Sequence, residues 1–260
     1  MKIWTITNQK GGVGKTTSVV TLGGILASAG ERVLLVDLDP HGSLTSYFRL
    51  DPDDIDKSVY NLFQSMVAKK PLDPQSLIQA TKTPGLDLLP ASTALATLDR
   101  QVGVKDGMGL VLATSLKKLE SEYSYALIDT PPMLGVLMVN ALAACNHLVI
   151  PVQTEFLALK GLERMLHTLS MIFKSTKREI DYTVVPTMFD QRTKASKDSL
   201  RALREQYPDN TWKSAIPVDT RFRDASSSGV PPSIFAPSAR GVEAYEALLQ
   251  ALDARQKAEQ

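Results

Sequence analysis

The sequence predicts an α/β fold in which a doubly wound, mostly parallel sheet carries helices on both faces. Short apolar runs rich in strand-forming residues alternate with longer segments of helical character, which is the rhythm of consecutive βαβ units. These runs cover residues 3–7, 33–36, 86–89, 125–128, 148–152 and 182–185. Their nearly continuous apolar character is typical of strands that are buried on both sides.

Helical patterns near both ends of the chain support this fold. After the first apolar run, small or apolar residues recur at helical spacing, and Gly30 is placed to end that helix; the residues on its face are Val19, Leu22, Gly23 and Leu26. The chain ends in an amphipathic helix whose apolar face carries Val242, Tyr245, Leu248, Leu249 and Leu252. Strand, glycine-rich loop and helix therefore follow one another from the N-terminus.

The segment 51–84 interrupts the alternation of strands and helices. Its prolines and acidic turn residues surround a helical pattern at residues 59–67. We interpret it as an excursion from the sheet rather than as a separate domain. Because no internal repeat, low-complexity tract or long linker is present, a single domain over residues 1–260 is the simplest organisation.

Composition limits the possible functions. Lys and Arg number 29 and Asp and Glu 28, so the net charge gives no general attraction to nucleic acid or anionic lipid. The single cysteine excludes an internal disulfide framework, and we find neither a signal-peptide pattern nor a run of about 18 apolar residues. We expect a cytoplasmic protein without stable membrane insertion. The three histidines lie far apart, so any metal is expected to arrive with a ligand.

Residues 10–17 have the pattern of a phosphate-binding loop. Gly11, Gly12 and Gly14 lie where a strand turns into a helix, so that backbone N–H groups and the helix N-terminus can face phosphate oxygens. Lys15 supplies a charge for the phosphates and Thr16 a hydroxyl for magnesium, while Val13 and Thr17 complete the loop. A glycine turn that only connects strand to helix is the plainer alternative. A dinucleotide fingerprint fails, because Thr17 occupies the place of its third glycine.

Three carboxylates follow two of the predicted strands. Asp37 and Asp39 come after the run 33–36, at the edge where open α/β sheets bind ligands. Asp39 can orient a water for attack on the γ-phosphate, and Asp37 can support magnesium or the loop, although Asp39-Pro40 is also an ordinary turn signal. Asp129 ends the run 125–128 in a Walker-B arrangement, which makes it a magnesium candidate; a lone aspartate there would otherwise be a cap or turn residue.

The sequence resembles the ParA/MinD family of deviant Walker-A ATPases, whose motif KGGxGK[ST] is matched by residues 10–16. The resemblance implies a P-loop NTPase fold of the SIMIBI type, ATP and Mg²⁺ as cofactors, and a role for Lys10 as the signature lysine that reaches the partner's phosphates in an ATP-sandwich dimer. By charge alone, Lys10 could equally be a solvated surface lysine. The family's switch motif DxDPQ is matched at residues 37–41 except that His41 replaces the glutamine.

The resemblance extends over nearly the whole chain, through residues 86–92, 148–155, 184–193 and 215–229. In the family, the segments around residues 187 and 217 lie near the adenine. This makes four residues candidates for contact with the nucleotide base: Thr187, Met188, Pro217 and Asp219. Met188 could equally be a core residue.

ParA-like partition proteins bind DNA nonspecifically through scattered basic residues, and one of these resembles Arg192 here, while Arg221 and Arg223 are further candidates nearby. The family's IPRN segment has Val218 and Asp219 in its last two places, so one arginine is lost. DNA binding therefore stays open, because affinity depends steeply on the number of phosphate contacts. A membrane-targeting tail is a poorer match, since the last helix mixes Asp253 and Arg255 instead of carrying a basic face.

We therefore expect a Mg-ATP-dependent ATPase that forms a homodimer on ATP binding and positions or segregates a cargo with the help of a stimulating adaptor protein. Residues 37–48, here called the switch segment, are most similar to the corresponding run in ParA-like proteins of chemotaxis gene clusters, which position chemosensory arrays. Plasmid or chromosome partition is the alternative. Association with the nucleoid or a cell pole would follow from either. Two other classes remain. One is a metabolic P-loop transferase similar to dethiobiotin synthetase, and the other is a nucleotide-binding scaffold that does not hydrolyse ATP.

Overall fold

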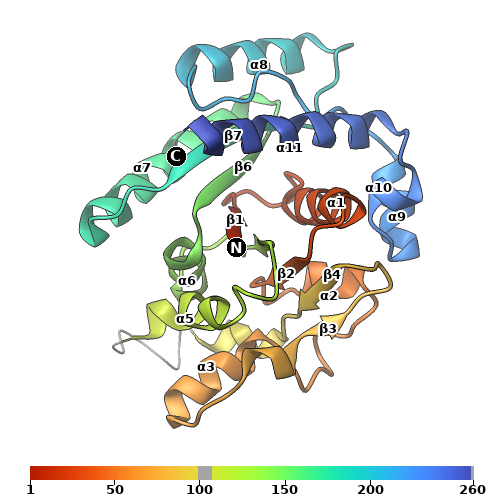
Figure 1. The fold of residues 1–260 in the computed structure, drawn as a ribbon. Helices are drawn as coiled ribbons and strands as arrows, with labels where there is room; N and C mark the ends of the chain where they lie inside the picture. Colours follow the sequence, from red (N-terminus) through yellow and green to blue (C-terminus); the bar gives the residue numbers. More distant parts are fainter. Residues whose placement is uncertain (99–106, 259–260) are drawn as a thin grey trace.

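The computed structural model describes residues 1–98 and 107–258, whose strands form one seven-stranded sheet (Figure 1). The strands are β1 (Lys2–Ile6), β2 (Val33–Asp37), β3 (Gln79–Ala80), β4 (Leu86–Leu89), β5 (Tyr125–Asp129), β6 (His147–Gln153) and β7 (Asp181–Thr187). The helices are α1 (Lys15–Ser28), α2 (Ser43–Tyr47), α3 (Val59–Ala68), α5 (Val111–Lys118), α6 (Val136–Ala144), α7 (Phe156–Thr176), α8 (Lys194–Gln206), α9 (Arg221–Ser228), α10 (Pro232–Phe235) and α11 (Arg240–Ala258).

The strands follow the order β3-β4-β2-β5-β1-β6-β7, and all neighbours run parallel except β3 and β4. The predicted doubly wound, mostly parallel sheet is confirmed. Strand β3 was not predicted, because an edge strand of two residues is too short to show a periodic pattern. The segment 51–84 thus leaves the sheet, contains α3 as predicted, and rejoins the sheet at its edge.

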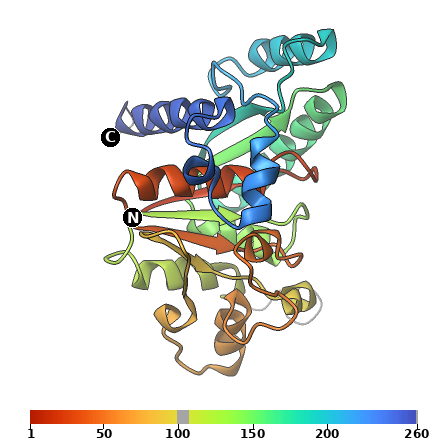
Figure 2. The ribbon, with the colours of Figure 1, turned by 90° about the vertical axis from the view of Figure 1, so that its right-hand side faces the viewer.

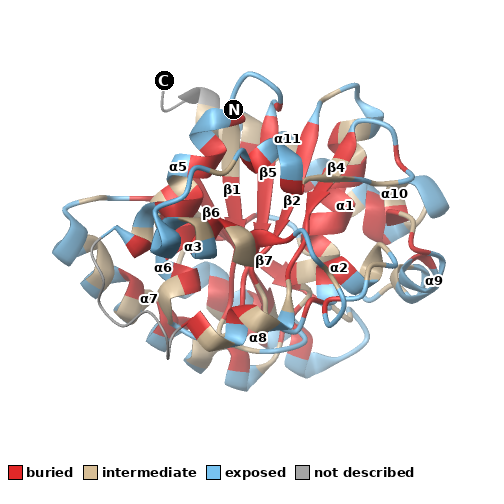
Figure 3. Cartoon of the chain, turned by 90° about the horizontal axis from the view of Figure 1, so that it is seen from below, coloured by how far each residue is buried: buried red, intermediate tan, exposed pale blue. Residues whose placement is uncertain are grey.

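The side chains of β2 point alternately to the two faces of the sheet, where they pack against two separate layers of helices. Leu34 and Val36 pack with residues of α3 and α5, whereas Val33 and Leu35 pack with residues of α1 and α11. Figure 2 shows α1 and α11 on one side of the strands and α3 and α5 on the other. A third cluster joins β6 to α6, α7 and α8. Burial is therefore concentrated in the sheet and in the inner faces of the helices (Figure 3), as expected for a parallel sheet covered on both faces.

Helix α1 fits closely between the sheet and the segment that contains α10. A Cβ on Gly23 would lie 2.8 Å from the Leu35 side chain, and one on Gly24 would lie 2.5 Å from Cβ of Pro231. The predicted end of the helix is confirmed: α1 stops at Ser28, and Gly30 has a φ of 89°. The hydroxyls of Ser18 and Tyr245 are 2.7 Å apart and link α1 to α11. These contacts fix the start of α1, where the glycine-rich loop ends.

The prediction of a single domain over residues 1–260 includes residues 99–106 and 259–260, which lie outside the described residues. Within the described part, the final helix buries Val242, Tyr245, Leu248 and Leu252, and it leaves Leu249 partly exposed. None of the described helices combines the length and the apolar character that a membrane crossing requires.

Candidate functional site

The glycine-rich loop joins the end of β1 to the start of α1. Gly12 and Gly14 have φ values of 73° and 96°, which side-chain-bearing residues rarely adopt. A Cβ on Gly11, Gly12 or Gly14 would have no atom within 4 Å, so the space above the loop is open. The loop therefore needs glycine for its backbone conformation, and it exposes that backbone next to the N-terminus of a helix of 14 residues.

A cavity of about 460 Å³ lies over this loop. Its lining comes from the loop, the segment after β2, and the ends of β5 and β7: Gly11, Gly12, Gly14, Lys15, Thr16, Thr17, Asp39, His41, Ser43, Pro132 and Met188. Parallel strands bring their carboxyl ends to one edge of the sheet, so these segments meet although they are far apart in sequence. Val13 is buried, and its carbonyl accepts a hydrogen bond of 2.9 Å from the Thr187 hydroxyl, which anchors the loop to β7.

Lys15 begins α1 and is nearly buried at the floor of the cavity. Burial lowers the pKa of its ammonium group, while the nearby carboxylates of Asp129 and Asp39 raise it. Its Nζ lies 3.4 Å from the carbonyl oxygen of Lys10, and it forms no ion pair with a described residue. A lysine that is held in place without an anionic partner is suited to bind an incoming phosphate.

Asp37 and Asp129 lie side by side in the sheet, since they are register partners of β2 and β5. Burial raises the pKa of both carboxyl groups, and for Asp129 the charge of Asp37 raises it further. The two groups differ in their partners. Asp37 accepts hydrogen bonds from the backbone and hydroxyl of Thr45, at 2.8 and 2.7 Å, and from the backbone of Asp39. Asp37 thus holds the segment that follows β2.

Asp129 accepts a hydrogen bond of 2.6 Å from the hydroxyl of Thr16 at Oδ2. Its Oδ1 is buried and has no hydrogen-bond partner among the described residues. A buried carboxylate oxygen without a partner is unfavourable unless a cation or donor arrives. The hydroxyl of Thr16 and the carboxylate of Asp129 are both oxygen ligands of the kind that magnesium prefers, so these two residues fit a magnesium site.

Asp39 lies at the mouth of the same cavity, two residues beyond β2. Its Oδ1 accepts hydrogen bonds from the backbone N–H of His41 at 3.0 Å and from Nδ1 of His41 at 2.8 Å. Its Oδ2 has no hydrogen-bond partner among the described residues. One carboxylate oxygen is therefore held by the protein, and the other is free to accept a hydrogen bond from water.

Lys10 has a different environment from Lys15. Its ammonium group forms an ion pair with Glu155 and lies 3.3 Å from Oε1 of Gln153, at the end of β6. Both side chains of the ion pair are about one third exposed, at 35% and 39%. Among the described residues that line the cavity over the loop, Lys10 is absent. No role was predicted for Glu155, because a glutamate that follows a strand gives no indication in the sequence of which residue it will contact.

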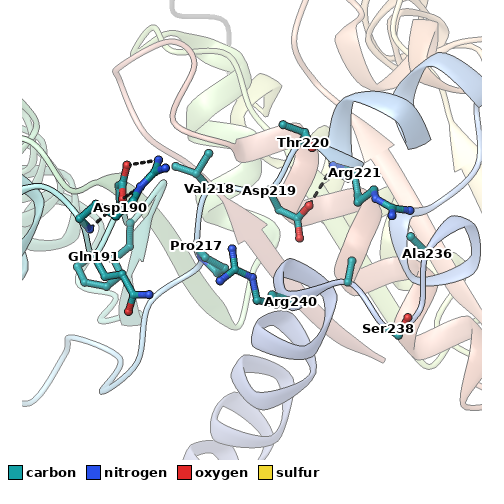
Figure 4. A pocket seen from close by; sticks show the side chains of 13 residues that line it. Asp190, Gln191, Pro217, Val218, Asp219, Thr220, Arg221, Ala236, Ser238 and Arg240 are labelled. Atoms are coloured by element: carbon teal, nitrogen blue, oxygen red, sulfur yellow. Dashed lines mark hydrogen bonds and ion pairs between the residues drawn. The ribbon is translucent and has the colours of Figure 1, made fainter.

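The four residues that were predicted to contact the nucleotide base do not all lie at the same cavity. Met188, with a φ of 53°, lines the phosphate-loop cavity, and the Thr187 hydroxyl donates its hydrogen bond to the carbonyl of Val13 in the loop. Pro217 and Asp219 line a second cavity of about 620 Å³ (Figure 4). The Asp219 carboxylate accepts hydrogen bonds of 3.0 Å from the backbone of Arg221 and from that of Gly241, so it ties α9 to α11. Contact of these residues with a base stays a prediction.

Two of the three basic candidates, Arg192 and Arg221, help to line the second cavity together with Arg240, whereas Arg223 on α9 is not part of its described lining. The guanidinium of Arg192 is paired with Asp190 through two hydrogen bonds of 2.9 and 2.8 Å. These bonds hold the pKa of the Asp190 carboxyl at about 2. Arg221, Arg223 and Arg240 form no ion pair with a described residue. Arg240 was missed in the sequence analysis because only the fold brings the start of α11 to this cavity.

A glycine loop between a central strand and a helix, a buried lysine, and a threonine paired with an aspartate on the neighbouring strand define the class of P-loop nucleotide-binding proteins. A family model described as an AAA domain matches residues 1–182. The chain is 38% identical over 245 residues to the sporulation initiation inhibitor protein Soj of Bacillus subtilis (strain 168), covering 94% of this chain and 95% of Soj. The chain therefore belongs to the ParA/MinD family, as predicted.

Two further similarities describe this family relationship. The chromosome partitioning protein ParA of Myxococcus xanthus is 33% identical over 248 residues, covering 95% of this chain and 86% of that protein. A structure of cobyrinic acid a,c-diamide synthase from Mycobacterium smegmatis, with bound ATP analog and magnesium, superposes with a TM-score of 0.84. It is 31% identical and covers 100% of this chain and 97% of that chain.

Proposed function

We propose that this protein is a magnesium- and ATP-dependent switch ATPase that dimerises when ATP binds and positions a cellular cargo. Support comes from the open glycine loop, from the buried Lys15, and from the Asp129 oxygen that has no hydrogen-bond partner in the described part of the chain. The similar synthase structure contains an ATP analog and magnesium, and a relative is named as a chromosome partitioning protein.

Thr16 and Asp129 would hold the magnesium ion, which supplies positive charge to the phosphate oxygens when it is bound. A cation there would compensate the two adjacent buried carboxylates, whose pKa values burial raises. Asp37 already bonds to Thr45 and Asp39. Of the two roles that the sequence left open for Asp37, this geometry supports holding the loop over binding magnesium.

The reaction is the transfer of the γ-phosphoryl group of ATP to water, which yields ADP and phosphate. Lys15 and the loop N–H groups stabilise the charge on the phosphates, and Oδ2 of Asp39 orients the attacking water. Such a reaction depends mainly on positioning and electrostatics, so a fixed Asp39 carboxylate contributes by placing the water.

The single observation that supports dimerisation is the position of Lys10. Its ammonium group is held by Glu155 and Gln153 outside the described lining of its own phosphate cavity. A lysine beside a phosphate loop that does not face its own phosphates is free to face those of a second copy. The Lys10–Glu155 ion pair is partly exposed, and exposed pairs contribute only about 0–1 kcal/mol, so Lys10 can leave it readily.

The test is sedimentation with Mg-ATP together with ATP turnover as a function of protein concentration. We expect Asp39→Ala to bind ATP and accumulate as a dimer with little turnover. Lys10→Ala should bind ATP as a monomer and lose the turnover that rises with protein concentration. Lys160 offers a matched control, since it is an exposed lysine paired with Glu163 at 3.1 Å on α7; Lys160→Ala should behave as the native protein.

Two outcomes contradict the proposal. One is an Asp39→Ala protein that stays monomeric with Mg-ATP, and the other is a Lys10→Ala protein with native turnover. A native protein that binds ATP and never releases phosphate, with or without duplex DNA, would instead identify the non-hydrolysing scaffold.

The cargo is proposed to be DNA or a DNA-bound complex, because the M. xanthus relative carries the name of a chromosome partitioning protein. A chemosensory array is the alternative cargo that the switch segment of the sequence favours. In both cases, we expect a stimulating adaptor protein and, when DNA is involved, association with the nucleoid.

A second candidate function is a metabolic P-loop transferase, which the similarity to the M. smegmatis synthase favours. An enzyme of that kind should release phosphate only when its small-molecule cosubstrate is present, and it has no need of Lys10. Turnover with ATP as the sole substrate, lost in Lys10→Ala, would exclude this candidate.

A further inference from the structure

His41 is the residue of the switch segment to which the proposed function assigns no role. It lies between β2 and α2 and lines the cavity over the phosphate loop together with Asp39. Its side chain is 78% exposed, whereas that of Asp39 is 14% exposed. The two side chains meet, with Nδ1 of His41 2.8 Å from Oδ1 of Asp39.

The chemistry of this contact fixes the tautomer of the imidazole. A carboxylate can only accept a hydrogen bond, so Nδ1 of His41 must carry the proton that lies between the two groups. The backbone N–H of His41 donates to the same oxygen, at 3.0 Å. Oδ1 of Asp39 thus receives two bonds from one residue, and Oδ2 keeps its accepting capacity, with no hydrogen-bond partner among the described residues.

This arrangement limits the rotation of the Asp39 carboxylate. With the backbone bond alone, either oxygen could take the Oδ1 position after a half-turn about the Cβ–Cγ bond, and intermediate orientations would be accessible. The second bond restrains the plane of the carboxylate, because the ring of His41 must remain in line with Oδ1. The other charged groups that act on Asp39 are Lys15, Asp37 and Asp129. None of these three donates a hydrogen bond to its carboxylate.

We propose that His41 is a positioning residue for ATP hydrolysis: its Nδ1–H holds Oδ1 of Asp39 so that Oδ2 accepts the hydrogen bond of the attacking water. This inference rests on the proposed role of Asp39 as the residue that orients the water. His41 would act in hydrolysis and not in nucleotide binding, because the groups that would hold the nucleotide are the backbone of the phosphate loop, Lys15 and Thr16.

The test compares three replacements of His41 in the full chain. The Nδ2–H of an asparagine occupies nearly the place of Nδ1–H in histidine, so His41→Asn keeps the donor, whereas His41→Ala removes it and His41→Gln moves it one bond further out. We expect His41→Ala to lower kcat about fivefold, because the bond to the carboxylate is charge-assisted but exposed. The KM for ATP and the ATP-induced dimer should be unchanged. His41→Asn should keep kcat within about twofold of the native value.

Two controls separate positioning from general damage. His167→Ala removes an exposed histidine on α7, away from the cavity, and should leave kcat, KM and dimerisation as in the native protein. In an Asp39→Ala background, His41→Ala should cause no further loss, because a residue that acts only through Asp39 has nothing left to position.

The results can overturn the inference in distinct ways. If His41→Ala has native kcat while Asp39→Ala is inactive, Asp39 does not need His41. The positioning role of His41 would then be wrong, and the proposed function would be unaffected. Equal losses in His41→Ala and His41→Asn, or a raised KM in both, would mean that His41 acts through something other than its Nδ1 donor. Native turnover by Asp39→Ala would remove both the role of Asp39 and that of His41.

Discussion

At the scale of single residues, the site separates side chains of the same type by their burial. Lys15 is nearly buried and forms no ion pair with a described residue, whereas Lys10 is partly exposed and paired with Glu155. Asp129 has a buried oxygen with no partner among residues 1–98 and 107–258, whereas both oxygens of Asp37 accept hydrogen bonds within the chain. These differences support the separate roles that the sequence predicts for the two lysines, and they distinguish Asp129 from Asp37, for which the sequence left magnesium binding and support of the loop open.

Replacing Lys15 should abolish tight ATP binding. In Lys15→Gln, the phosphate charges lose the cation at the floor of the cavity, and we expect the affinity for ATP to fall at least about a hundredfold, on the scale of a lost charge-assisted contact. Isothermal titration with Mg-ATP measures this, and Lys160→Gln on the exposed face of α7 is the matched control. A folded Lys15→Gln protein with native ATP affinity would contradict the phosphate-loop assignment.

Asp129→Asn should stabilise the nucleotide-free protein while removing its response to magnesium. Burial raises the pKa of the Asp129 carboxyl to about 8. The unfolded chain is ionised above the ordinary value of about 3.9, so the native state loses stability as pH rises from that value towards 8. An amide has no charge to bury, and we expect Tm at pH 8 to rise by about 3 °C or more, with a smaller gain at pH 5.

Differential scanning fluorimetry of both proteins at the two pH values measures this change. Addition of Mg-ATP should raise the Tm of the native protein and have little effect on Asp129→Asn. A native-sized shift with Mg-ATP in Asp129→Asn would show that magnesium is held elsewhere.

At the scale of elements, helix α1 is positioned by glycines as well as by its apolar residues. Gly23 faces the sheet and Gly24 faces the segment 231–233, and an added Cβ at either would come within 3 Å of a neighbouring atom. The helix therefore lies closer to its neighbours than a helix with alanine at these positions could. This close packing fixes the direction in which the phosphate loop presents its backbone, because the loop continues directly into α1.

Gly24→Ala should destabilise the protein by about 1–3 kcal/mol, since the methyl group would overlap Pro231 and Ser233. Gly161 in α7 is the matched control, because a Cβ there meets no atom within 4 Å. Gly161→Ala should instead stabilise the protein by about 0.5–1 kcal/mol through helix propensity. Urea unfolding of both variants measures the two changes, and destabilisation by Gly161→Ala equal to that by Gly24→Ala would contradict the packing argument.

At the scale of the whole molecule, we propose that Arg192, Arg221 and Arg223 form the surface that a dimer would present to DNA. The whole chain is nearly neutral, with a formal net charge of +1, so binding would depend on local arginines. Arg192 is already paired with Asp190, whereas Arg221 and Arg223 have no such partner among the described residues. Arg221 and Arg223 should therefore contribute more to phosphate contact than Arg192.

We expect the Asp39→Ala dimer to bind duplex DNA with modest affinity that falls steeply as salt rises, since phosphate contacts release counterions. Arg221→Glu and Arg223→Glu should each weaken binding more than Arg192→Glu. Arg164→Glu, an exposed change on α7, is the control. Fluorescence anisotropy at low and moderate salt checks this. Tight DNA binding that changes neither with salt nor with the three Arg→Glu substitutions would contradict the proposed DNA-binding surface. No DNA binding even at low salt would instead favour a cargo that the protein recognises through another protein.

The sequence by itself determined the parallel strands of the sheet, though not the two-residue edge strand β3, because apolar runs of strand length and the glycine loop are local patterns that need no knowledge of the rest of the chain. It also determined which side chains to examine at the loop and after β2 and β5, since strand ends are where parallel sheets bind ligands. Only the tertiary structure decided their partners. The bonds of Asp37 to Thr45 and of Lys10 to Glu155 depend on distances and burial, and so does the Asp129 oxygen that has no partner among the described residues. Residues far apart in sequence, such as Lys10 and Glu155 or Thr16 and Asp129, come into contact only when the strands align, so no local pattern encodes these contacts.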